Sequence, residues 1–313
     1  MSVAITLGII FIGLAVGSFL NAVVFRLGSG ESALWGRSHC MSCKHVLEWY
    51  ELIPVASFIM LGGECRACHA PISFQYPIVE ILTAAIFFFV HQSYQSALFL
   101  DSPFSAAVFF LGGFANFLGL TFYLAAAFLL LAVAVYDFRT FIIAPAFMIP
   151  LFLLSMVSLA GQFIPPPSRI PCGFAAGMNG DFKSFPQDSI PCGKVGGFIS
   201  SSSITAVGQT IVLAVVAFAV FAALWFFSKG RAMGFGDAEL AAAIALLLGF
   251  SKGLAALLFA FWAGALVGIF LILLGRYKLK SEIPFGPFLS GGALAALIWG
   301  DAVIQGYLSF LLL

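Results

Sequence analysis

Residues 206–227 read AVGQTIVLAVVAFAVFAALWFF, a run of 22 residues without a charged side chain. A helix that crosses the hydrocarbon core of a bilayer needs about 20 predominantly apolar residues. The run therefore predicts a membrane-spanning helix, and the rest of the chain can be searched for the same pattern.

The composition extends this prediction to the whole chain. Of its 313 residues, 62% are hydrophobic and only 9% are charged, whereas soluble domains have about 25% charged and about 45–50% apolar residues. This excludes a soluble globular protein, a disordered chain and a collagen. The net charge of +1 arises from 14 basic and 13 acidic residues. The chain therefore has no broad basic face, and we expect no nucleic-acid partner.

Eight apolar segments predict an all-α, polytopic membrane protein that contacts lipid. Two of the segments are short. The segment 77–91 ends at a histidine, which a glutamine follows, and the segment 238–250 follows a glycine-containing stretch that can lengthen it. The chain starts without a charged segment or a small-residue cleavage site, so 3–25 is interpreted as a retained span rather than a signal peptide. The eight segments are 3–25, 77–91, 115–136, 141–163, 206–227, 238–250, 254–275 and 287–311.

Lysine and arginine residues are unevenly divided between the two sides that eight spans define. One side has ten and the other has four, and the richer side is expected to face the cytosol. The resulting division is a first span at 1–25, a small cytosolic tetracysteine domain at 26–76, and a transmembrane core at 77–313. The core includes an external loop at 161–205, which is rich in glycine, proline and serine.

Four cysteines in the cytosolic segment form two CxxC pairs, Cys40 with Cys43 and Cys65 with Cys68. Zinc prefers four thiolates in a tetrahedron, and each CxxC turn supplies two of them. The reducing cytosol disfavours disulfides there. We expect a structural zinc site that holds together a domain with little core of its own. Free cysteines and an iron–sulfur site are the alternatives.

Two further cysteines, Cys172 and Cys192, lie 20 residues apart in the external loop. An oxidising exterior permits a disulfide between them, which would stabilise the loop by about 3 kcal/mol. Two free thiols are the alternative interpretation.

Two aspartates stand at the ends of predicted spans, Asp137 after the third and Asp237 before the sixth. Two spans separate them, so both lie at the same membrane surface, and the same parity places the tetracysteine domain there. Two carboxylates held close together share one proton, so one can activate water while the other protonates a scissile carbonyl. Gly234 and Gly236 would let a peptide approach closely. Alternatively, Asp137 ends a helix beside Arg139 and Asp237 only caps the next helix.

Short motifs occur in a fixed order along nearly the whole chain. They are Gly17-Ser-Phe-Leu-Asn21, Arg26, the two CxxC pairs, Tyr50-Glu-Leu-Ile-Pro54, Tyr76-Pro-Ile-Val-Glu80, Asp137, Gly234-Phe-Gly-Asp237 and Ile283-Pro-Phe-Gly-Pro-Phe288. This ordered set resembles the type IV prepilin peptidases, the leader peptidase/N-methyltransferases of pilus and type II secretion systems, which are GxGD membrane aspartic proteases.

The resemblance implies that Asp137 and Asp237 are the catalytic pair and that the four cytosolic cysteines bind zinc. It implies cleavage of a basic leader from a prepilin or pseudopilin at the cytosolic face of the bacterial inner membrane. In many members the new N-terminal amine is then methylated, with S-adenosylmethionine as the methyl donor. Neither the particular pilin nor the oligomeric state follows from the resemblance.

No glycine-rich nucleotide-binding turn marks the methyl-donor site. Beyond a minimal GxGD protease, the chain has residues 17–26, the domain at 26–76 and Glu80, so we expect the methyl donor near them. A buried carboxylate at Glu80 is costly, which fits either a ligand contact or a structural hydrogen bond. Asn21 and Arg26 are likewise either ligand contacts or a packing amide and an interfacial charge.

The chain departs from the family pattern at three places. Glu239 stands where the family usually has lysine. Seven residues after the first aspartate the family commonly has proline, whereas this chain has Ala144 there and Pro145 next. The loop 161–205 is longer than expected. None of these removes a catalytic residue. The competing functions are a GxGD protease without methyl transfer, an ion- or proton-coupled transporter and a non-enzymatic assembly factor.

Overall fold

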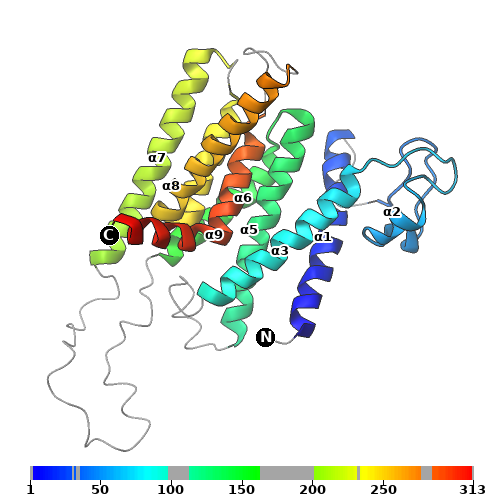
Figure 1. Cartoon of the computed structure of the whole chain (residues 1–313), viewed down its shortest axis with the longest axis horizontal. Coiled ribbons are helices and arrows are strands. Elements are labelled where there is room, and N and C mark those ends of the chain that lie inside the picture. Colours follow the sequence, from blue (N-terminus) through cyan, green and yellow to red (C-terminus); the bar gives the residue numbers. More distant parts are fainter. Residues whose placement is uncertain are drawn as a thin grey trace, which may run out of the picture.

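The computed structural model describes residues 3–29, 32, 36–97, 113–162, 201–230, 233–275 and 284–311, and the regular elements of these residues are helices (Figure 1). Two short elements, η1 and α2, lie in the cysteine-containing segment beside α1 and α3. The elements are α1 (Val3–Ser29), η1 (Trp49–Leu52), α2 (Ala56–Met60), α3 (Gln75–Ala97), α5 (Gly113–Thr140), α6 (Pro145–Gly161), α7 (Ser201–Ser228), α8 (Phe235–Leu273) and α9 (Gly286–Leu311).

Six of the described helices are long and apolar enough to cross a membrane, and α6 is a shorter apolar helix. The 39 residues of α8 would extend for about 58 Å as one straight helix, nearly twice the hydrocarbon core. At Gly249 the backbone leaves the helical conformation, with φ of 78° and ψ of 178°. A Cβ on Gly253 would lie 3.1 Å from the Cα of Ala245, so α8 doubles back at this point. The prediction of an all-α, polytopic membrane protein is confirmed, and in the described residues the eight predicted spans correspond to six helices of spanning length, one of them the bent α8, and the shorter α6.

The start of the predicted fourth span is wrong by four residues. Phe141 has a left-handed φ of 56°, which interrupts the helix after α5. The next helix begins at Pro145, whose ring fixes φ at a helical value and whose missing N–H is not needed in the first turn. The short link between α5 and α6 therefore lies directly after Asp137.

Polar side chains stabilise the turn at Gly249 inside the bundle. The hydroxyl of Ser158 donates a hydrogen bond of 2.6 Å to the carbonyl of Leu247, and Thr210 donates one of 3.0 Å to Gln162. A carbonyl that a helix break releases in an apolar environment needs such a donor. Helices α6 and α7 therefore contribute to the reversal of α8.

The core centres on α5, the first half of α8 and α9, and it also includes buried residues of α1, α3, α6 and α7. Many of its fully buried residues are alanines, which allow helix axes to approach closely in a membrane. Most residues between Ala238 and Leu247 are buried, so this short half of α8 contacts protein rather than surroundings. That explains how a segment too short for a lone span fits into the bundle.

Candidate active site and metal centre

Asp137 lies in the last turn of α5 and Asp237 in the first turn of α8, and the structure brings the two carboxylates together. Both are buried, with 4% and 5% of their surface exposed, and they interact electrostatically. Asp237 also accepts a 3.1 Å hydrogen bond from the backbone N–H of Gly234, so the capping role considered from the sequence is present as well. Neither carboxylate forms an ion pair with any residue that the structure describes.

Gly286, the first residue of α9, is a site residue whose role could not be read from the sequence. Its backbone N–H donates a hydrogen bond to Asp137. A Cβ at Gly286 would lie 2.5 Å from Oδ2 of Asp137, closer than side chains tolerate. The only signal in the sequence was the glycine within the motif Ile283–Phe288, and its partner is 149 positions away.

Gly236 has a packing role in the structure. It lies in the first turn of α8, and a Cβ there would lie 3.2 Å from the Cβ of Ile143. The link after α5 can therefore approach the start of α8 closely, which brings Asp137 to Asp237. Gly234 precedes the helix in an extended conformation, and its backbone N–H donates the hydrogen bond that the Asp237 carboxylate accepts.

Glu239, which departs from the family pattern, lies two residues after Asp237. Residues two apart point to different sides of a helix, and Glu239 is exposed whereas Asp237 is buried. We expect Glu239→Lys to change the rate of peptide cleavage by less than about threefold, because an exposed charge contributes little. A peptide-cleavage assay of this variant beside the parent checks this, and a loss as large as that of an Asp237 variant would contradict it.

The four cysteines of the two CxxC pairs form one cluster. Sγ of Cys40 lies 3.9 Å from Sγ of Cys68, and Sγ of Cys43 lies 4.0 Å from Sγ of Cys65. The four sulfur atoms lie within 4.8 Å of one another. A tetrahedral zinc site with bonds of about 2.3 Å separates its sulfurs by about 3.8 Å, whereas a disulfide needs about 2.05 Å. The donor set therefore fits a closed structural zinc site and does not fit disulfides.

Each CxxC pair lies in a turn of the same construction. The backbone N–H of Lys44 donates to the carbonyl of Cys40 at 3.0 Å, and that of His69 donates to the carbonyl of Cys65 at 2.9 Å. Lys44 and His69 both have left-handed φ values, 61° and 55°. The two turns present their sulfurs to each other, so the domain is organised around the metal position.

The pKa values of two thiols of the cluster are shifted in opposite directions. The backbone N–H of Cys43 lowers the pKa of the Cys40 thiol to about 6. The backbone N–H of Ala70 acts to lower the pKa of Cys68, but the neighbouring sulfurs outweigh it and raise that pKa to about 12. Four thiolates so close together repel one another, so full ionisation requires a metal ion.

We expect one zinc ion per chain in purified protein. Cys65→Ser should lower the zinc content and make residues 36–74 sensitive to protease, because the domain has little other core. His69→Asn is the matched control, since His69 is exposed beside Glu64 and asparagine tolerates its positive φ. Elemental analysis and limited proteolysis check this. A metal-free parent protein with unchanged protease resistance would contradict the assignment.

Three other residues were expected near a ligand. Asn21 is buried between α1 and α3, and its Nδ2 donates a 3.1 Å hydrogen bond to the carbonyl of Tyr76. Arg26 donates a 3.0 Å hydrogen bond to the carbonyl of Gly36. Glu80 is buried and accepts a 2.7 Å hydrogen bond from the backbone N–H of Val55. Both Arg26 and Glu80 line one cavity.

The predicted disulfide between Cys172 and Cys192 lies outside the described residues, as does nearly all of the loop 161–205. The structure therefore tests neither the predicted disulfide nor the predicted external loop.

Comparisons with known proteins cover both halves of the chain. Residues 11–94 match the model of the bacterial peptidase A24 N-terminal domain, and residues 187–269 match that of the type IV leader peptidase family. The first match contains the tetracysteine segment and the second contains Asp237. No solved structure matches the chain.

Several relatives named prepilin leader peptidase/N-methyltransferase are similar over most of the chain. The protein of Bacillus subtilis is 29% identical, with 98% of this chain and 99% of the relative covered. That of Burkholderia pseudomallei is 28% identical over 93% of this chain and 84% of the relative. That of Myxococcus xanthus is 32% identical over 87% of this chain and 64% of the relative. With two family models and these relatives in agreement, the chain belongs to the type IV leader peptidase family.

Proposed function

We propose that this protein cleaves the basic leader peptide from type IV prepilins or pseudopilins and N-methylates the new N-terminus. The names of its relatives support both activities. The observation on which the proposal mainly rests is the pair of buried carboxylates at the ends of α5 and α8, Asp137 and Asp237.

Peptide hydrolysis needs a base for water and an acid for the carbonyl, and the pair supplies both. Two neighbouring carboxylates share one proton. The ionised carboxylate takes a proton from water while the protonated one donates to the carbonyl oxygen, so that a tetrahedral intermediate forms. When the C–N bond breaks, the nitrogen takes up a proton and leaves as the new N-terminal amine. The hydrogen bonds from Gly286 and Gly234 hold the two aspartates in place.

The surface near the pair suits an apolar substrate segment. Phe138, Phe141 and Ile142, which follow Asp137 directly, are all exposed. Large exposed apolar side chains at a membrane surface can contact the apolar part of a prepilin that follows its leader. This arrangement would present the junction between the polar leader and the apolar segment to the carboxylates.

The proposed location is the bacterial cytoplasmic membrane, with the aspartates and the cysteine cluster on the cytosolic side. The excess of lysine and arginine on that side supports this orientation. A cytosolic site would meet the basic leader before the pilin is exported, and cytosolic thiols remain reduced for zinc.

Methyl transfer follows cleavage and needs a second site. S-adenosylmethionine, when bound, supplies the methyl group: the amine nitrogen forms a bond to carbon, the C–S bond breaks with its electron pair left on sulfur, and the amine loses a proton. The aspartates contribute only by producing the free amine. The N-terminal family match, with its tetracysteine segment, supports the complete bifunctional protein over a protease alone.

A peptide assay tests the proposal. Purified protein in detergent is incubated with a synthetic prepilin peptide that contains its basic leader, and the products are identified by mass spectrometry. We expect hydrolysis of one peptide bond, and addition of one methyl group to the new N-terminus when S-adenosylmethionine is present. An intact peptide would contradict the peptidase function, and a cleaved but unmethylated peptide would contradict the methyltransferase function alone.

A further inference from the structure

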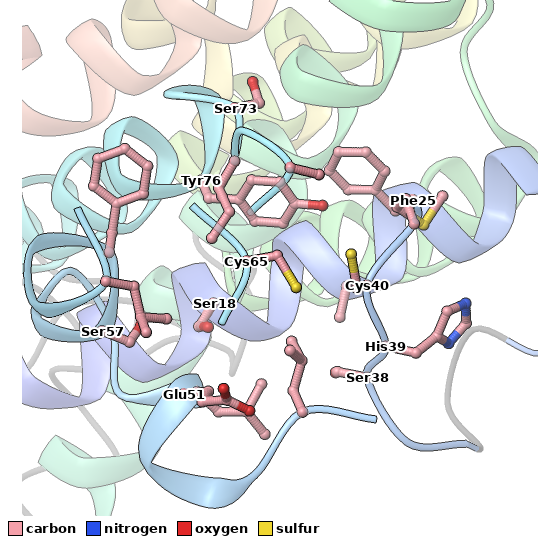
Figure 2. A pocket seen from close by; sticks show the side chains of 18 of the residues that line it. Ser18, Phe25, Ser38, His39, Cys40, Glu51, Ser57, Cys65, Ser73 and Tyr76 are labelled. Atoms are coloured by element: carbon pink, nitrogen blue, oxygen red, sulfur yellow. The ribbon is translucent and has the colours of Figure 1, made fainter. Parts of the chain in front are cut away.

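A cavity of about 340 Å³ lies between the tetracysteine domain and the helices α1 and α3 (Figure 2). Its wall includes Ser18 and Phe25 of α1, Glu51 of η1, and Tyr76 and Glu80 of α3. Small-molecule sites usually enclose about 300–1,000 Å³. The cavity is therefore large enough for one compact ligand.

The close approach of α1 to α3 forms one wall of this cavity. A Cβ at Gly17 would lie 2.7 Å from the Cα of Glu80, so only glycine permits the observed packing. The hydrogen bond from Asn21 to the carbonyl of Tyr76 fixes the start of α3 against α1. The first motif of the chain, Gly17–Asn21, thus positions the wall and contributes Ser18 to it.

Glu51 has an unsatisfied oxygen in this cavity wall. Its side chain is only 2% exposed, and Oε2 accepts a 2.8 Å hydrogen bond from the backbone N–H of Glu48. Oε1 is buried and has no hydrogen-bond partner among the described residues. Nε2 of His45 lies 3.7 Å from Oε2, which is too long for a hydrogen bond. A buried carboxylate oxygen without a donor is costly, and a ligand whose positive charge or donor reached Oε1 would remove that cost.

The other charged residues of the wall favour a ligand of mixed charge. Glu80 adds a second buried carboxylate, held by the N–H of Val55 at 2.7 Å and by Ser18. Val55 has a φ of 60°, which is strained for a β-branched residue. Arg26 and Arg66 line the same cavity. Carboxylates and guanidinium groups around one small space suit a ligand that itself has cationic and anionic groups.

Aromatic rings form another part of the wall. Phe25 and Tyr76 are stacked, with centroids 4.9 Å apart and an interplanar angle of 7°, and Figure 2 shows them side by side at the cavity. Such flat apolar surfaces suit a heteroaromatic base. The guanidinium of Arg139 lies 3.7 Å from the ring centre of Phe25. Because Arg139 follows Asp137 by two residues, these stacked side chains connect the cavity wall with the aspartate pair.

We propose that this cavity binds S-adenosylmethionine and is the methyl-donor site. The molecule has a planar adenine, a sulfonium and an ammonium group, and a carboxylate. The aromatic wall suits the adenine, Glu51 and Glu80 balance the two positive groups, and Arg26 or Arg66 balances the carboxylate. This assignment rests on the methyltransferase half of the proposed function, and it names the residues that would serve it.

Equilibrium binding to the purified, zinc-containing protein in detergent tests the assignment. The two probes are S-adenosylmethionine and S-adenosylhomocysteine, which lacks the methyl group and the sulfonium charge. We expect the parent protein to prefer the charged molecule. Glu51→Gln keeps the shape of the side chain but removes its charge, and should weaken S-adenosylmethionine binding about tenfold, with a smaller effect on the neutral sulfide. Glu64→Gln, an exposed carboxylate of the same domain outside the cavity wall, should bind both probes like the parent.

The ratio of the two affinities separates a charge effect from misfolding, since a misfolded domain loses both ligands together. Parent-like preference in Glu51→Gln would overturn the cavity assignment. Competition of a basic leader peptide with bound S-adenosylmethionine would also overturn it, because the carboxylates would then recognise the leader. If the parent protein methylates pilin but Glu51→Gln keeps the parental preference for S-adenosylmethionine, only the assignment of the cavity is contradicted. A parent protein that neither binds the methyl donor nor methylates contradicts the methyltransferase function itself.

Discussion

Asp137→Asn and Asp237→Asn are each expected to lower the rate of prepilin cleavage by about 10²–10⁴-fold, the usual contribution of a general acid or base. Asparagine keeps the size of the side chain and can still accept the hydrogen bonds from Gly286 and Gly234. It cannot exchange the proton, so the fold should remain while hydrolysis is lost. Peptide cleavage kinetics, together with thermal stability in detergent, measure both effects.

A double variant shows whether the two aspartates act as one unit. If they share one proton, the double Asn variant should be no slower than the worse single variant. Asp301→Asn is the matched control, because Asp301 is exposed and forms an ion pair with Lys252 at 2.7 Å, away from the aspartate pair. Losses that multiply in the double variant, or parent-like cleavage by either single variant, would contradict the shared site.

Gly286→Ala is expected to have the next largest effect. The added Cβ would lie 2.5 Å from Oδ2 and 3.0 Å from Cγ of Asp137, so the carboxyl group must move. A displacement of about 1 Å in a catalytic group can lower the rate about 100-fold. Alanine is favoured over glycine in a helix, so stability should not fall in proportion to activity.

Gly291→Ala in the same helix is the control for Gly286→Ala. No atom lies within 4 Å of the position that a Cβ at Gly291 would take. This variant should cleave prepilin peptide at the parental rate. Equal kcat values for the two alanine variants would show that Gly286 does not position Asp137.

Features that repeat or that depend on parity could be predicted from the sequence. Apolar length predicted the helices, and the CxxC spacing predicted the cysteine cluster. Counting spans placed Asp137 and Asp237 at one surface, and the structure brings them together. These patterns are local, or need only the number of crossings, so no knowledge of packing was required.

Long-range pairs could not be predicted, because neither periodicity nor spacing specifies which residues meet. The contact of Gly286 with Asp137 joins α9 to α5, and that of Gly236 with Ile143 depends on the shape of a link. The fourth span was placed too early because its apolar pattern continues through Phe141, whose left-handed φ arises from the turn. The motifs at Ser18, Glu51 and Glu80 were visible in the sequence, but that three separate segments enclose one cavity could not be read from their spacing.

The central claim is that the aspartates of α5 and α8 form the hydrolytic site of a prepilin leader peptidase. The most direct measurement is the intact mass of a prepilin co-expressed with the parent protein or with its Asp137→Asn variant in cells without another such enzyme. The account predicts a mature pilin that has lost its leader in the first case and a full-length precursor in the second. A mature pilin in cells with the variant, or an intact precursor in cells with the parent, would contradict it.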